Sequence, residues 1–200
     1  MNLRVWLLLL GAVAIMSFAA MVLVVVPAAL LTEVKPSPGL EPYTASEASG
    51  RGVYIREGCM YCHSQQVRDT TITTDEARGW GRPSVPGDYV YDAPHQLGTM
   101  RTGPDLMNVG ARLPDRRWQL LHLYQPRAVV PWSIMPSFPY LFEVKAQAGP
   151  DDEVVTVPPA WAPESGVVVA GPEAVALVDY LLSLDHTQPL APTEATPRAR

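Results

Sequence analysis

The chain has only two cysteines, and they lie three residues apart in the segment Cys59-Met60-Tyr61-Cys62-His63. This C-x-x-C-H pattern is typical of covalent haem attachment, because two thiols at this spacing can add to both vinyl groups of one haem and the adjacent histidine can bind the iron. A redox dithiol would need a thioredoxin-like βαβ pattern, and a zinc site would need about four ligands. Neither companion pattern is present in the sequence. We therefore predict one covalent haem c on Cys59 and Cys62, with His63 as the proximal iron ligand.

The iron needs a second ligand opposite His63. Met60 is excluded because it is trapped inside the attachment loop. We favour Met135, which lies in a proline-stiffened loop between the haem motif and the last predicted helix. A thioether opposite an imidazole raises the haem potential relative to two histidines, and it predicts one-electron transfer. The other candidates are Met107, expected in the core, Met100, expected as a ligand or a surface residue, His122, expected as a packed and satisfied side chain, and His95 and His186, expected at the surface.

Further residues are expected around the haem. The segment 102–106 contains Pro104, whose carbonyl can accept the ring proton of His63 and fix its orientation. Forked donors suit carboxylates, so the haem propionates have three candidate partners, Arg101, Arg112 and Arg127. No general acid, general base or substrate pocket is evident in the sequence. Chemistry on a substrate would then belong to a partner.

The N-terminal part reads as a membrane segment. From Val5 to Leu31 the chain runs for 27 residues without a charge, which is roughly 40 Å as a helix against about 30 Å for a bilayer core. A cleaved signal normally has an apolar region of only about 7 to 15 residues, although the small residues at 28–29 resemble a cleavage site. Arg4 before the run and Glu33 with Lys35 after it favour a cytoplasmic N-terminus. We expect a single-pass anchor over 1–34.

The remaining sequence predicts an all-α protein with long insertions. A connector over 35–43 precedes a capping box at Thr44 and Glu47, so a helix is expected from Ala45. Further helices are expected over 115–124 and 172–184. Residues 65–102 predict a long structured loop, and 143–171 an acidic, proline-rich segment with short strands at 154–157 and 167–169. A main domain over 44–186 with insertions at about 65–102 and 143–171 would be followed by a disordered tail over 187–200. The net charge of −5 offers little to a nucleic acid.

These residues resemble a known family. The helix before the cysteines and the last helix resemble those of class I cytochromes c, in which Tyr180 would meet Gly50 and Tyr54. Five blocks in order resemble the monohaem cytochrome c subunit of cbb3-type cytochrome c oxidases: 54–65, 87–92, 101–106, 122–127 and 130–136.

The resemblance implies a haem domain on the periplasmic side of the bacterial inner membrane, held against a catalytic haem-copper subunit. Electrons would pass from a dihaem c subunit or a soluble cytochrome c to haem b of that subunit. His63 and Met135 would be the axial ligands, and Cys59 and Cys62 the thioether anchors. The family can also hold a calcium ion near the subunit boundary, and Ser84 lies in the matching loop.

Two other functions remain open at this point. One is the cytochrome subunit of a nitric oxide reductase, which also combines an anchor with one haem c. The other is a free membrane-tethered electron shuttle. The loop 65–102 favours the oxidase over the reductase, and the segments 65–102 and 143–171 exceed what a shuttle would need.

Overall fold

The computed structural model describes residues 2–98 and 100–190. The chain divides into two compact units between Pro36 and Ser37, and each is described separately. The part of the predicted tail from 191 onward lies outside the described residues.

The first unit is one continuous helical stretch. It consists of α1 (Leu3–Ala20), a π-helical turn (Met21–Val25) and α2 (Val26–Leu31). The wider π turn precedes Pro27, which has no N–H to donate to the carbonyl four residues earlier. The stretch Leu3–Leu31 has a mean hydropathy of 2.8 and buries none of its side chains within this chain. Its length and composition are sufficient to cross a membrane.

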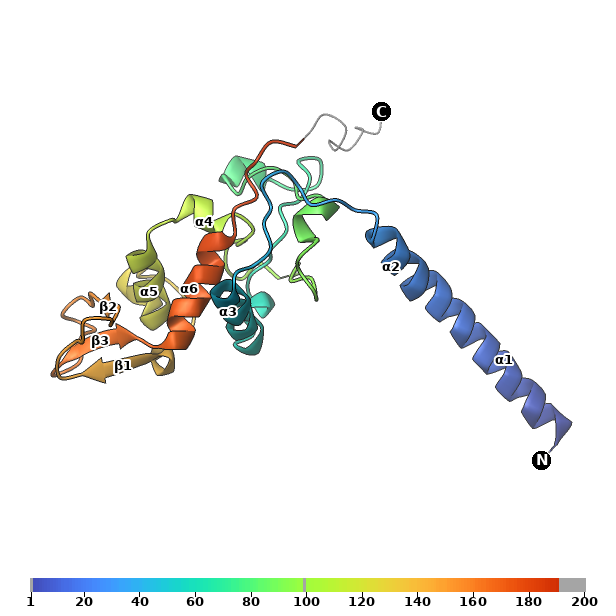
Figure 1. The fold of residues 1–200 in the computed structure, drawn as a ribbon, viewed down its shortest axis with the longest axis horizontal. Helices are drawn as coiled ribbons and strands as arrows, with labels where there is room; N and C mark the ends of the chain where they lie inside the picture. The colour runs from blue at the N-terminus through green and yellow to red at the C-terminus, as the bar shows by residue number, and fades with distance from the viewer. Residues whose placement is uncertain (1, 99, 191–200) are drawn as a thin grey trace. The chain divides into compact units, whose positions relative to one another are not determined.

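The second unit is built on two helices, α3 (Ala45–Arg56) and α6 (Pro172–Ser183), which lie side by side in Figure 1. Both begin as the sequence predicts. The hydroxyl of Thr44 accepts from the N–H of Glu47 at 3.3 Å, and the Glu47 carboxylate accepts from the N–H of Thr44 at 2.7 Å. The reciprocal pair satisfies two backbone donors at the start of α3.

The crossing of α3 and α6 is close because α3 has a glycine there. A Cβ on Gly50 would lie 1.8 Å from the backbone oxygen of Ala176. One turn further on, the rings of Tyr54 and Tyr180 meet edge to face with centroids 5.5 Å apart. The predicted contact between Tyr180 and Tyr54 is therefore present, whereas Gly50 meets the α6 backbone at Ala176 and Leu177.

Two shorter helices complete the core beside α6: α4 (Val109–Arg112) and α5 (Arg116–Tyr124). The carboxylate of Asp115 caps α5 by accepting from the N–H of Arg117 at 2.9 Å. Short 3₁₀ turns occur at Cys59–Tyr61, Glu76–Arg78, Pro86–Tyr89, Pro126–Ala128 and Pro139–Leu141.

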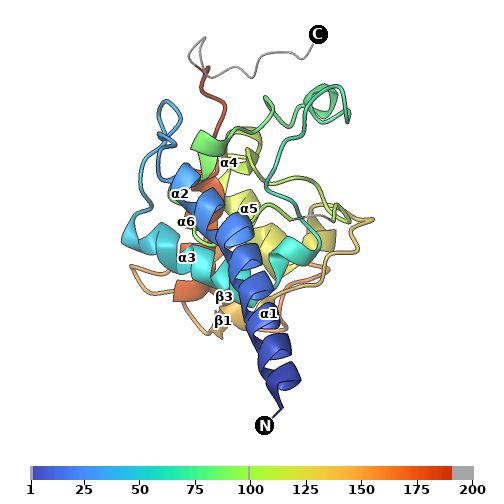
Figure 2. The same ribbon diagram turned by 90° about the vertical axis from the view of Figure 1, so that its right-hand side faces the viewer.

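The long loop after the attachment turn has little regular secondary structure, as Figure 2 shows, and buried ion pairs order it. Its carboxylates Asp75, Asp88 and Asp92 pair with Arg101, Arg82 and Arg51, respectively, and each carboxylate side chain is at most 6% exposed. The Arg51–Asp92 pair fixes the loop to α3, whereas the other two pairs join residues within the loop region that are 26 and 6 positions apart.

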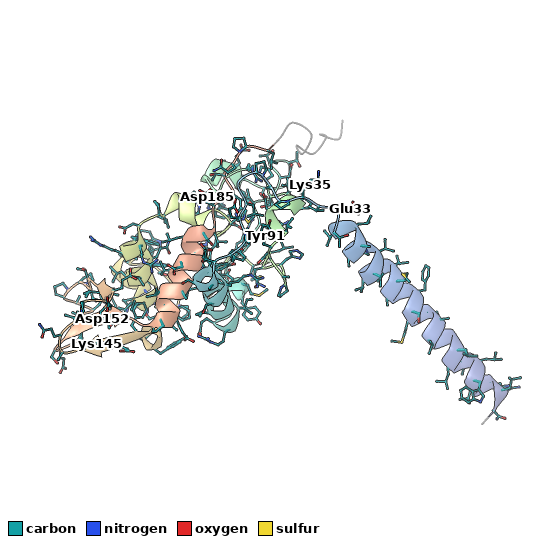
Figure 3. All side chains as sticks on the ribbon, in the orientation of Figure 1. Glu33, Lys35, Tyr91, Lys145, Asp152 and Asp185 are labelled. Atoms are coloured by element: carbon teal, nitrogen blue, oxygen red, sulfur yellow. The ribbon has the colours of Figure 1, made fainter. Side chains whose placement is uncertain are left out.

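The second insertion holds a small antiparallel sheet, which the all-α prediction missed. Its strands are β1 (Phe142–Lys145), β2 (Val154–Val155) and β3 (Val167–Ala170), in the order β1-β3-β2. Phe142 pairs with Ala170, and Val155 with Val168. Strands were predicted near β2 and β3, but β1 was not. Figure 3 shows Lys145 and Asp152 close together at this sheet, where the ammonium donates to the carboxylate at 2.7 Å.

The connector predicted over 35–43 packs on the second unit from Ser37 onward. The N–H of Ser37 donates to the carbonyl of Gly87 at 3.1 Å, and Ser37 is only 6% exposed. The ring of Tyr43 lies 5.6 Å from that of Tyr180. Only residues 32–36 therefore separate the end of α2 from this anchored segment.

Candidate haem site

The attachment motif occupies the 3₁₀ turn Cys59–Tyr61, directly after α3. Gly58 stops the helix with a left-handed backbone, φ 71°. The N–H groups of Cys62 and His63 then both donate to the carbonyl of Cys59, at 3.1 and 3.0 Å. Cys59 begins the turn and Cys62 caps it, so the turn brings the two cysteines close to each other. Both thiols are free.

The ring of His63 is held on one nitrogen and leaves the other available. Its Nδ1 lies 2.7 Å from the carbonyl oxygen of Pro104, the contact expected from the sequence. An imidazole that donates through Nδ1 presents the lone pair of Nε2 to a metal. Gly103 lies against the ring, since a Cβ there would be 2.3 Å from Cε1 of His63. Only glycine gives the ring room in this position.

The buried carboxylate of Asp105 holds together the two segments on which His63 and Pro104 lie. Asp105 is fully buried, and one of its oxygens accepts from the Ser64 hydroxyl at 2.5 Å and from the Gln66 N–H at 2.8 Å. The other oxygen accepts from the N–H of Met107 at 2.8 Å. Asp105 thus joins the strand-like segment after His63 to the segment carrying the Pro104 carbonyl.

The protonation of His63 suits metal binding. Burial lowers its pKa below the ordinary value and outweighs the Pro104 carbonyl and Asp105, which both raise it. The neutral imidazole, the form that binds metals, is therefore favoured.

Met135 lies in a segment without regular secondary structure, and its side chain is half-buried against the core. Its N–H donates to the hydroxyl of Ser133 at 3.2 Å. The neighbouring side chains of Trp132 and Ile134 are 83% and 76% exposed. The methionine is therefore the side chain of this short stretch that turns toward the core.

The other candidate ligands divide between surface and core. Met107 is 2% exposed, as expected for a core residue, and Met100 is 57% exposed. His95 is exposed, as predicted. The surface prediction for His186 is wrong: it is 8% exposed, and its Nδ1 lies 3.0 Å from the Met107 carbonyl.

His122 is packed but not satisfied, contrary to the prediction. Its ring stacks on Trp118 with centroids 4.6 Å apart, yet its buried Nδ1 has no hydrogen-bond partner. Burial, with a smaller contribution from His63, lowers the pKa of His122 to about 4. Because the sequence around His122 is apolar, sequence reasoning did not predict this unpaired neutral imidazole.

The three candidate arginines have different surroundings. The Arg101 guanidinium donates to both oxygens of Asp75 at 2.6 and 2.7 Å, to Ser64 and to the carbonyl of Gln66. Arg127 donates to the segment around Met135. Arg112 donates to the carbonyl of Asp105, but its buried Nε has no partner.

The residues fit a covalent haem. Two free thiols lie at the two ends of one turn, the adjacent imidazole has Nε2 available because Nδ1 is engaged, and glycine lines the ring. The unpartnered Nε of Arg112 is a donor suited to an anionic group such as a propionate.

The calcium expectation finds no support. The Ser84 hydroxyl accepts from the N–H of Val67 at 3.0 Å. Within residues 2–98 and 100–190 there is no group of three or more His, Cys, Asp or Glu side chains that could hold a metal ion.

Sequence reasoning missed residues whose roles depend on distant contacts. Asp75 and Ser64 anchor Arg101 behind the proximal segment. Gly98, with φ 67°, passes so close to the attachment turn that a Cβ would lie 2.7 Å from the carbonyl of His63. A glycine in a long loop was the sole local signal for such a close approach.

Fold and site together are those of c-type cytochromes: two crossing helices, a C-x-x-C-H segment directly after the first of them, and a histidine ring oriented by a backbone carbonyl. The chain belongs to the family described as cytochrome c oxidase, mono-heme subunit/FixO, whose family model matches residues 1–157. This confirms the family predicted from the sequence, and membership implies a haem c cofactor and a place in a cbb3-type oxidase with a catalytic subunit. A search of curated proteins found no match. The matched part includes the apolar helix and the attachment turn and ends before β3 and α6.

Proposed function

We propose that this chain is the membrane-anchored electron relay of a cbb3-type terminal oxidase. Electrons would arrive from a dihaem c subunit or a soluble cytochrome c and leave for haem b of the catalytic haem-copper subunit, where oxygen is reduced. The observation that carries the proposal is the His63 imidazole, engaged at Nδ1 by Pro104 directly after the attachment turn, in a chain of the FixO family.

Each residue has a distinct task in this proposal. Cys59 and Cys62 would form the thioether bonds, and His63 and Met135 would be the axial ligands. Haem c would supply reversible one-electron chemistry, with its potential raised by the thioether ligand. Pro104 keeps the imidazole in a single tautomer and orientation, and Gly103 gives the ring the space it needs.

The anchor and its tether would keep the haem domain at the membrane. We propose that Leu3–Leu31 spans the bacterial inner membrane once, with the haem domain on the periplasmic side. Five residues, 32–36, separate α2 from the anchored Ser37. Such a segment spans at most about 17 Å when fully extended. A domain on so short a tether stays close to the membrane surface, where a membrane-embedded catalytic subunit would meet it.

Purification of the intact chain from its membrane tests the assignment. In mild detergent, a reduced pyridine haemochrome spectrum should show haem c with companion haem b, and the preparation should consume oxygen in a cyanide-sensitive manner. Nitric oxide turnover without oxygen uptake would favour a reductase instead. Haem c on a chain that migrates alone would favour the tethered shuttle.

The distal ligand is tested by a pair of methionine variants. Met135→Ala should keep the haem covalently attached, lower its potential and stop electron flow to haem b. Met100→Ala is the matched control, because that side chain is 57% exposed. An unchanged potential in Met135→Ala would assign the distal position to another residue, with the partly buried His122 the first to examine.

A further inference from the structure

We propose that Arg127 is a positioning residue that holds the methionine loop, defined as residues 133–137, and thereby keeps Met135 on the iron. The inference rests on the proposed function, because it needs Met135 as the distal ligand. Its basis is the set of contacts that one guanidinium makes across the loop.

The methionine loop has little support of its own. It has no regular secondary structure, and Pro136 has no N–H to donate. The loop is fixed by the N–H of Ser133, which donates to Val130 at 2.9 Å, and just beyond it by the N–H of Phe138, which donates to Leu123 at 3.0 Å. The exposed Ile134 adds little packing within this chain.

The guanidinium of Arg127 spans the loop between these anchors. Its Nη1 donates to the carbonyls of Ser133 and Met135, at 3.3 and 3.5 Å. Its Nη2 donates to the hydroxyl of Ser137 at 3.4 Å. The carbonyl of the proposed ligand and the residues two positions to either side are thus all tied to one planar cation.

The base of this side chain is rigid. Arg127 lies in the 3₁₀ turn Pro126–Ala128, which directly follows α5. The turn is closed by the N–H groups of Ala128 and Val130, which donate to Gln125 and Pro126 at 3.0 and 2.9 Å. Gln125 also accepts from the Ser137 hydroxyl at 3.1 Å. The methionine loop is therefore fixed to the end of a core helix, not to another loop.

The shape of the arginine distinguishes this role from charge pairing with a propionate. A guanidinium presents several donors in one fixed plane, whereas a lysine ammonium is a compact point charge. Replacing Arg127 by lysine preserves the positive charge and removes the fork. If Arg127 acts by positioning the loop, Arg127→Lys should lose that effect. If it acts only through its charge, Arg127→Lys should largely keep the effect.

Exogenous imidazole measures how often Met135 leaves the iron. Its apparent affinity is proportional to the fraction of molecules with an open distal position. Loss of the contacts made by Arg127 should raise that fraction and the apparent imidazole affinity about tenfold. Ser137→Ala removes one of the Arg127 contacts together with the hydrogen bond to Gln125, and should also raise the affinity, by a smaller factor than loss of the guanidinium.

The experiment uses the full chain with haem attached, in mild detergent. Imidazole titrations of the ferric protein are run on wild type, Arg127→Lys, Arg127→Gln and Ser137→Ala. Arg117→Lys is the matched control, because Arg117 is exposed on α5. The absorption band of the ferric haem that reports thioether ligation is recorded for each variant, together with the midpoint potential.

We expect Arg127→Lys and Arg127→Gln to bind imidazole about equally tightly, both more tightly than wild type, with a weaker thioether band and a lower potential. If Arg127→Lys binds imidazole with the same affinity as wild type and as the Arg117→Lys control, the proposal is overturned. A wild-type chain without the thioether band would instead remove Met135 as ligand, and the inference with it. If neither Arg127 variant matures, unchanged imidazole binding in Ser137→Ala overturns it.

Discussion

Replacing Gly50 by alanine should destabilise the haem domain at the crossing of α3 and α6. The added Cβ would lie 1.8 Å from the oxygen of Ala176 and 2.9 Å from the nitrogen of Leu177. Real Cβ atoms essentially never approach closer than 3.0 Å, so at this point the two helices must separate by about 1.2 Å. The obstacle is backbone inside a helix, which cannot rotate away as a side chain can.

The cost follows from the packing that this separation opens. A gap of about 0.5–1 Å forfeits roughly a quarter to a half of the dispersion energy of the atoms involved, and overpacked sites typically lose about 1–3 kcal/mol. The side chains that line this contact, Tyr54, Leu177 and Tyr180, are at most 1% exposed. The upper end of that range, about 3 kcal/mol, therefore applies. Alanine regains about 1 kcal/mol of helix propensity, which leaves a net loss of about 2 kcal/mol.

Thermal unfolding of the haem-loaded full chain in mild detergent, followed by circular dichroism, measures this loss. For a unit of this size, about 2 kcal/mol corresponds to a midpoint lowered by roughly 4–8 °C. Gly52→Ala is the matched control on the same helix, since its Cβ would meet nothing within 4 Å and should raise stability slightly. If both alanine variants unfold at the same temperature, the close crossing is refuted.

Three further predictions concern the site and its supporting loop. Cys62→Ser should impair covalent attachment, so that haem staining of the denatured chain falls sharply; normal staining would remove the attachment assignment. Gly103→Ala should displace the His63 ring, since the added carbon would lie 2.3 Å from it, and the haem potential should shift while staining persists; an unchanged potential would contradict the contact. Burial alone would raise the pKa of Asp75, but hydrogen bonds from Arg101 and a backbone N–H outweigh it and lower the pKa. The pair therefore stabilises the fold above about pH 4 and less as the pH falls toward the lowered pKa, and Asp75→Asn should flatten the acid limb of unfolding midpoints measured against pH.

Local signals in the sequence predicted α3, α5 and α6, but not the four-residue α4. The Thr44 and Glu47 capping box marks the start of α3 to the residue. The proline-led apolar pattern predicted α6 over 172–184, and the helix is Pro172–Ser183. In both cases the signal lies within one turn of the structure that it specifies, so no distant contact had to be known.

The second insertion shows where such reasoning stops. The valines of β3 mark it as a strand, but β1 has the mixed sequence Phe142-Glu143-Val144-Lys145 and becomes a strand because β3 pairs with it. That pairing joins residues more than twenty positions apart. A period of two cannot be recognised reliably in four residues, two of them charged.

Prediction of the long loop over 65–102 from sequence is limited in the same way. Its glycines and prolines exclude regular structure, and that much was predicted. The carboxylates Asp75 and Asp92 are as plausible at the surface as in the interior from sequence alone. Their burial depends on arginine partners that the folded chain brings to them, Arg101 and Arg51. Partner choice between distant charges has no local signature.

The three arginines proposed as propionate contacts also cannot be told apart from sequence, because the folded chain decides which of their donors are free. A guanidinium has five donors, and a role toward an anion depends on which of them the protein leaves free. Arg101 spends its donors on Asp75, Ser64 and a backbone carbonyl, and the contacts of Arg127 go to the methionine loop. Arg112 keeps a buried Nε without a partner, and an unsatisfied buried donor costs about 1–3 kcal/mol. An anionic acceptor would recover that energy, so Arg112 is the arginine of the three that we propose as a propionate partner. Loss of charge at Arg112 should therefore change the haem potential more than at Arg101, where the guanidinium is already neutralised by Asp75.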